Sequence, residues 1–188
     1  MNLWAMLVAT ALAVSSSWLQ GRTGQNDELS ILEAVLAEPD PSWMTVAQRV
    51  VVSPTTELDY AHPWVHSSTE RGITRNASGE SFTISEALIE AAKLANRRAL
   101  SLVSLQLPSR LQLLRDPCGE SWVVTLSRPG ISLDRSEAIV GATIDEPSHC
   151  GVQRGVVTVR GARGITYFLE RGPDRAWHIV GHGLEWIT

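Results

Sequence analysis

The chain has 188 residues, which is enough for one domain of ordinary size with a sizeable hydrophobic core. Its formal net charge of -4 supplies no positive field for a phosphate backbone, so the composition argues against nucleic-acid binding. The sequence shows no heptad pattern, solenoid repeat or low-complexity tract.

The first element along the chain is an apolar leader at residues 1–17. Its apolar run from Asn2 to Val14 is shorter than the ~20 residues that span a bilayer and has the length of a signal-peptide core. Small residues follow, so cleavage after Ala13 or Ser17 fits signal peptidase. The usual positive charge before the core is missing, which leaves a retained anchor or a buried N-terminal helix as alternatives. We expect a secreted or periplasmic protein that meets the membrane only transiently through the leader.

A helix and a strand are predicted next. Asn26 or Asp27 can cap the helix, and two prolines after residue 38 end it. Its apolar residues recur at helical spacing: Leu29, Leu32, Val35 and Leu36. One face of this helix should therefore pack inward. The β-branched, apolar run at residues 46–52 predicts a strand that the proline at 54 ends.

A long polar segment at residues 53–80 interrupts these elements. It contains two histidines, His62 and His66, and near them the carboxylates Glu57 and Asp59. Imidazole and carboxylate groups are zinc ligands, so the segment is a weak candidate metal site. Long loops in compact domains often bind ligands, and the alternative is a surface loop without a ligand.

The second predicted helix has a capping-box spacing, with Thr83 followed by Glu86. Its expected inward stripe is Ala87, Leu88, Ala91, Leu94 and Ala95. This pattern is that of an amphipathic helix with one face on a core. The apolar stretch at residues 100–107 extends the helix or forms a strand.

From residue 121 the apolar period changes from helical to alternating. Two strands each place one apolar face on a core: Trp122, Val124 and Leu126 in the first, and Ala138, Val140, Ala142 and Ile144 in the second. Three further strands are separated by short turns: residues 156–160, 165–170 and 176–180. We expect one α+β domain at residues 26–188, with N-terminal helices packed on one face of a C-terminal antiparallel meander sheet.

Cys118 and Cys150 are the only cysteines. In an exported chain two thiols favour one disulfide. The bridge would close a loop of roughly 32 residues, which the chain-entropy model values at roughly 3 to 4 kcal/mol. The alternative is a catalytic thiol beside His149, but neighbours in a strand point to opposite faces.

Other polar groups favour structural roles. His178, His182 and Glu185 have a spacing that would suit zinc on a helix, but the glycines at 181 and 183 break a helix, so we expect a solvated His178. Arg128, Asp134 and Arg135 flank one turn, and an ion pair among them would fix it.

The serines at 127, 132 and 136 lack the Gly-x-Ser-x-Gly elbow of a nucleophile. Trp122 and Trp177 should pack in the core, whereas Trp43, Trp64 and Trp186 lie near element ends, where they could line a cleft.

The C-terminal half contains a Leu-Ser-Arg strand end at 126–128, an Asp-Arg-x-x-Ala strand at 134–138, a Cys-Gly turn at 150–151 and the run Trp-His-Ile-Val at 177–180. In these motifs it resembles a loose group of exported bacterial proteins of uncharacterised function. A second Cys-Gly pair of that group is replaced here by Arg154-Gly155. The resemblance implies export and a compact α+β body, and it implies no activity.

These observations leave two functional hypotheses. The favoured one is an exported domain that binds a small molecule or a partner protein without catalysis and without a cofactor. The other is a small metal-dependent hydrolase that uses His62 and His66 with Glu57 or Asp59. Metal analysis of the untagged protein distinguishes the two hypotheses.

Overall fold

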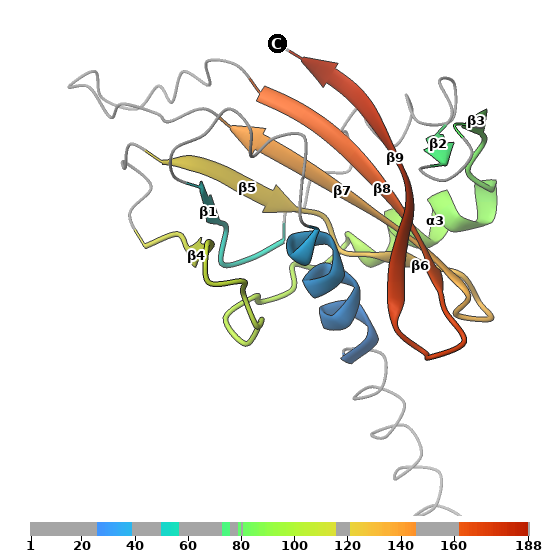
Figure 1. Cartoon of the computed structure of the whole chain (residues 1–188), viewed down its shortest axis with the longest axis horizontal. Coiled ribbons are helices and arrows are strands. Elements are labelled where there is room, and N and C mark those ends of the chain that lie inside the picture. The colour runs from blue at the N-terminus through green and yellow to red at the C-terminus, as the bar shows by residue number, and fades with distance from the viewer. Residues whose placement is uncertain are drawn as a thin grey trace, which may run out of the picture.

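The computed structural model describes residues 26–38, 50–56, 73–75, 79, 81–115, 121–145 and 162–187. The leader, both cysteines, His62 and His66, and the strand expected at 156–160 lie outside these residues. One helix covers residues 26–37, and the other elements are β1 Val50–Val52, β2 Ile73–Arg75, β3 Ser81–Phe82, α3 Glu86–Ala95, β4 Gln112–Leu113, β5 Trp122–Leu126, β6 Gly130–Ile131, β7 Glu137–Asp145, β8 Ala162–Arg171 and β9 Trp177–Ile187 (Figure 1). The fold is α+β, as the sequence predicts.

The strands form one mixed sheet in the order β3-β2-β9-β8-β7-β5-β1-β4, with β6 paired to β7. Its centre is the expected antiparallel meander of β7, β8 and β9. The expectation of a purely antiparallel sheet is wrong, because β1 runs parallel to both β4 and β5. The chain between β1 and β5 contains α3, and such a long crossover connection permits parallel pairing.

The main core lies between the sheet and the 26–37 helix. Ile31, Leu32, Val35 and Leu36 are buried there against strand residues such as Val140 and Leu169. Trp177 belongs to this core and Trp122 packs against it, as expected. The apolar stripe of the helix therefore has the predicted role.

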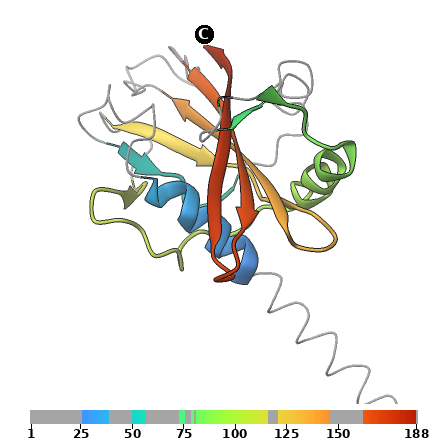
Figure 2. The ribbon, with the colours of Figure 1, turned by 45° about the vertical axis from the view of Figure 1, so that its right-hand side comes forward.

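A second, smaller core lies on the other face of the sheet. Its strand members, Ile139 and Phe168, alternate with the residues that face the main core. From α3 it takes Leu88, Ile89 and Ala92. The two helices thus cover opposite faces of the sheet (Figure 2), and the expectation that both cover one face is wrong.

Burial on both faces changes the character of β7. Its residues 138–144 are all buried, although the alternating pattern predicted that only every second residue points to a core. At two of the three intervening positions the residues are not large and apolar, Gly141 and Thr143, and this hid the second buried face from the sequence pattern. A strand covered on both sides is apolar on both sides.

The inward stripe predicted for α3 is also wrong in most positions. Among its five expected members only Leu88 is buried, while Leu94 is 62% exposed. The helix begins two residues later than expected, with Ser85 as its N-cap in place of Thr83. The stretch at 100–107 is neither helix nor strand, because only Ser101 forms an isolated bridge, to Thr55.

Candidate functional site

A groove lies between α3 and the turn that joins β6 to β7. It has a volume of about 620 Å³. The residues of α3 and its flanks that line it are Ser85, Ala87, Leu88, Glu90, Ala91, Lys93, Leu94 and Arg97, and those of the turn are Ile131, Ser132, Leu133 and Asp134. Of the three described large apolar side chains that are exposed, two line this groove, Leu94 and the fully exposed Leu133. We take this groove as the candidate functional site.

The α3 wall of the groove is the face that the sequence assigned to the core. Ala87, Ala91 and Leu94 are spaced at i, i+4 and i+7, so they lie on one side of the helix. The neighbouring stripe with Leu88, Ile89 and Ala92 packs on the sheet. The sequence signal for this site was that a ten-residue helix carries two apolar stripes. Only one stripe packs on the sheet, so the other stays exposed.

The opposite wall is a turn held by hydrogen bonds to Asp134. Its Oδ1 accepts from Ser132 Oγ at 2.7 Å, from Ser136 Oγ at 2.8 Å and from Ser136 N at 3.1 Å. These bonds, first of all the one from Ser132, lower the pKa of Asp134 below its ordinary value of 3.8. Arg135 takes a left-handed backbone conformation with φ 58°. The turn is therefore a defined structure, and Leu133 at its tip faces solvent.

Close packing fixes the helix against β6. A Cβ atom at Gly130 would lie 2.6 Å from Ala92 Cβ and 2.7 Å from both Ala92 Cα and Ala92 N. Only glycine permits this approach, because no side-chain carbon fits at such distances. The two walls of the groove are therefore set by a direct contact between helix and strand.

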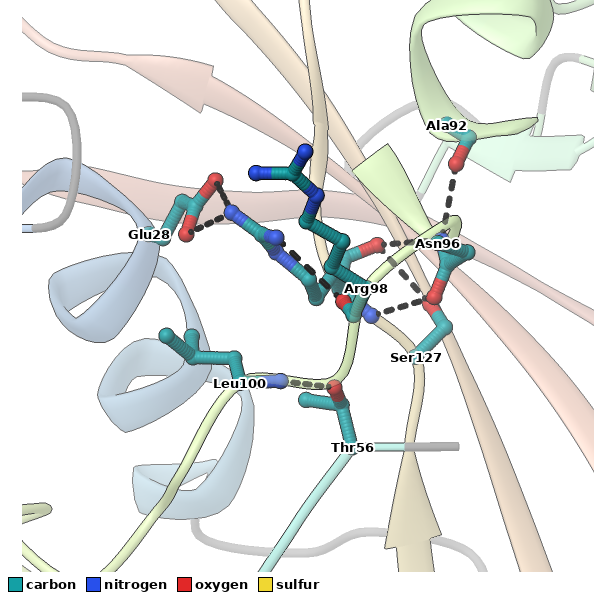
Figure 3. A network of polar contacts seen from close by, with 8 residues as sticks. Glu28, Thr56, Ala92, Asn96, Arg98, Leu100 and Ser127 are labelled. Carbon is teal, nitrogen blue, oxygen red and sulfur yellow. Dashed lines mark hydrogen bonds and ion pairs between the residues drawn. The ribbon is translucent and has the colours of Figure 1, made fainter. Parts of the chain in front are cut away.

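Asn96 ties the end of α3 to the chain that follows β5. Its buried Nδ2 donates to Ala92 O at 2.8 Å and to Arg128 O at 2.9 Å, and Arg128 N donates to its Oδ1 at 2.7 Å. Figure 3 shows Asn96 between Ala92 and Ser127. Gly130 follows Arg128 by two residues. The hydrogen bonds of Asn96 therefore hold the α3 wall and the opposite wall together at one end of the groove.

The charges that line the groove are not equivalent. Lys93 Nζ forms an ion pair with Glu90 Oε1 at 2.6 Å, and the carboxylate of Asp134 accepts hydrogen bonds within the turn. Arg97 lies at the C-terminal end of α3, and its guanidinium has no partner among the residues that the structure describes. Among the described groups that line the groove, Arg97 is thus the one cation without a described counter-charge, and it lies at one end of the groove.

The arginines near the turn pair with the 26–37 helix and not with Asp134. Arg128 Nη2 donates to both carboxylate oxygens of Glu28, at 2.7 and 2.8 Å. Asp27 accepts from Arg135 at 3.2 Å and from Arg171 at 3.3 Å. The expected ion pair within the turn is wrong, because these arginines pair with the helix instead. Asp27 lies inside the helix, so its carboxylate binds two arginines and does not cap the helix. These contacts anchor the helix to the sheet and its turns.

The histidines of β9 form no metal site with described neighbours. His178 is exposed, as expected, and its Nε2 lies 3.2 Å from Asp174 Oδ1. This contact is the main reason that the pKa of Asp174 lies below its ordinary value. His182 is exposed, and the side chain of Glu185 is not among those that the structure describes. Within the described ranges no three metal-ligating side chains gather.

Both cysteines lie outside the described residues, but the strands next to them are paired. Val123 of β5 lies opposite Asp145 of β7. Cys118 precedes this pair by five residues and Cys150 follows it by five. The ends of β5 and β7 that are nearest to the two cysteines in sequence are therefore neighbours in the sheet.

Comparison with protein-family models, with curated proteins and with solved structures finds no match for the chain. Among the described residues, no helix is both long enough and apolar enough to cross a membrane.

Proposed function

We propose that this protein is an exported, non-catalytic binding domain whose site is the groove between α3 and the β6–β7 turn. One observation carries the proposal: an apolar hollow of about 620 Å³ lies between two elements that are locked together at Gly130. Small-molecule sites are preformed, largely apolar hollows of about 300–1,000 Å³ with a few polar groups. The groove has this size and this composition.

The polar groups around the groove support binding more than catalysis. Its serines, Ser85 and Ser132, already serve as a helix cap and a turn brace, and no described histidine lines it. A nucleophile needs an adjacent base, and a general acid needs a free titratable group within reach of the substrate. Export is proposed from the leader and from the resemblance of the C-terminal half to exported bacterial proteins.

A fluorescence titration tests the proposal. The full chain is titrated with N-phenyl-1-naphthylamine, a dye that brightens in apolar sites, and we expect saturable binding. Ala91→Trp should abolish binding, because the indole fills the groove next to Leu94. Ala37→Trp is the matched control, since Ala37 is an exposed alanine at the end of the other helix.

Two results would contradict the proposal. In the first, Ala91→Trp folds, as shown by its circular dichroism, and binds the dye like the parent protein. In the second, the untagged protein contains one equivalent of zinc, which would favour the hydrolase hypothesis with His62 and His66.

A further inference from the structure

We infer that the groove takes a monomeric amphiphile with one apolar chain and an anionic head group, and that Arg97 binds the head. This inference rests on the proposed function and names the ligand class for the same site. The head group is a carboxylate or a phosphate, since both match the planar donors of a guanidinium.

The size of the groove favours a small ligand over a protein. Twelve of the described residues line it, whereas a standard protein interface uses about 20 to 30 residues on each partner. Along α3 the lining extends from Ser85, which precedes the first turn of the helix, to Arg97, which follows its last turn. A ten-residue helix is about 15 Å long, so the groove suits an extended chain laid along α3.

The walls supply an apolar surface for such a chain. Ala87, Ala91 and Leu94 form one side, and Ile131 and Leu133 form the other. Alanines at the first two positions leave room beside the helix, and the two leucines are exposed. Covering them removes apolar surface from water, which is the main favourable term for an acyl chain.

The charges fix the direction of the ligand. An anionic head is disfavoured near Asp134, whose lowered pKa keeps it ionised at neutral pH, and Lys93 is already paired with Glu90. Arg97 has no described partner, and it lies where α3 ends. The head therefore binds at Arg97, and the chain runs back toward Ser85.

Displacement of the dye by three ligands tests the inference: dodecanoate, dodecyl phosphate and uncharged dodecanol, all below their micelle concentrations. We expect the two anions to bind more tightly than the alcohol. Arg97→Gln should weaken both anions about tenfold, the scale of one charge-assisted hydrogen bond, and leave dodecanol unchanged.

Arg98→Gln is the matched control, because Arg98 is the neighbouring exposed arginine and does not line the groove. Figure 3 shows the Arg98 guanidinium without a marked contact. Equal loss in the Arg97 and Arg98 variants would indicate general attraction by surface charge and would overturn the inference.

The outcomes separate the inference from the proposed function. If Arg97→Gln binds all three ligands like the parent while Ala91→Trp binds none, the groove holds apolar chains without head recognition and only the inference fails. If no ligand and no dye binds, both fail. Binding to phosphatidylglycerol vesicles without binding of any monomeric amphiphile would assign the surface to a membrane and would also overturn the inference.

Discussion

Single polar residues set the geometry of the groove. Asn96 uses both ends of its amide, so one side chain closes α3 and also fixes the backbone of Arg128. It is almost completely buried, and buried polar groups stabilise a structure only when all their hydrogen bonds are made. The sequence could not assign this role, because an asparagine at a helix end is typical of an exposed cap.

Replacement of this amide should be costly. Asn96→Ala removes three hydrogen bonds and leaves the N–H of Arg128 without its acceptor, so we expect the free energy of unfolding to fall by about 2 to 4 kcal/mol. Urea denaturation followed by tryptophan fluorescence measures the change. Gln106→Ala is the control, since the amide of Gln106 is exposed and its loss should change stability by less than about 0.5 kcal/mol. Equal stability of the two variants would contradict the role of Asn96.

Asp134 makes the turn sensitive to acid. Its pKa is lowered in the folded protein by bonds from Ser132 and Ser136, so the ionised form stabilises the fold above the unfolded pKa. That contribution is lost as the pH falls through the lower, folded pKa. We expect Asp134→Asn to be less stable than the parent at neutral pH, with a difference that shrinks to zero in strong acid. Thermal unfolding at a series of pH values tests this, and a difference that grows toward low pH would contradict it.

At the scale of elements, two helices are held to opposite faces of one sheet by different means. The 26–37 helix combines a four-residue apolar stripe with ion pairs from Asp27 and Glu28 to three arginines of the sheet and its turns. The shorter α3 relies on a smaller core and on close contact with β6. The position of α3 is therefore more sensitive to the size of a single residue in this contact.

Gly130 is that residue. Gly130→Ala would place a methyl group 2.6–2.7 Å from three Ala92 atoms, two of them backbone, so α3 must move away. Overpacking of this kind costs about 1 to 3 kcal/mol, and we expect weaker dye binding in the groove at the same time. Gly172→Ala is the matched control, because its close contacts are the side chains of Asp174 and His178, which can rotate away. Unchanged dye affinity in Gly130→Ala would show that the groove does not depend on this contact.

Sequence patterns predicted the elements better than their partners. The stripe at Leu32 and Val35 was correct, and the alternation around Val140 correctly identified the strand residues that face the main core but missed the burial of the other face. The stripe of α3 was misplaced because the helix has two apolar sides, and the side with Ile89 is the one that packs on the sheet. The sequence did not reveal the groove for the same reason, because no local sequence pattern shows that Leu94 and Leu133 line its opposite walls.

On the scale of the whole molecule, chain connectivity brings distant segments together. The mixed sheet places β5 between β7 and β1, so the strand next to Cys118 pairs with the strand before Cys150. Parallel pairing of β1 depends on contacts across more than sixty residues, which no local pattern encodes. The same connectivity gives the proposed disulfide a structural basis, because Val123 and Asp145 are register partners.

A bridge between Cys118 and Cys150 should therefore stabilise the whole fold. It would tie together the chain entering β5 and the chain leaving β7, and closure of this loop is worth roughly 3 to 4 kcal/mol. We expect that reduction lowers the free energy of unfolding by about this amount, and that a Cys118→Ser, Cys150→Ser double variant shows the lowered stability without reductant. Urea denaturation with and without dithiothreitol measures both, and the double variant should not respond to dithiothreitol. Two thiols that react with iodoacetamide in the unreduced protein isolated from its natural host would contradict the bridge, because a disulfide leaves no thiolate to alkylate.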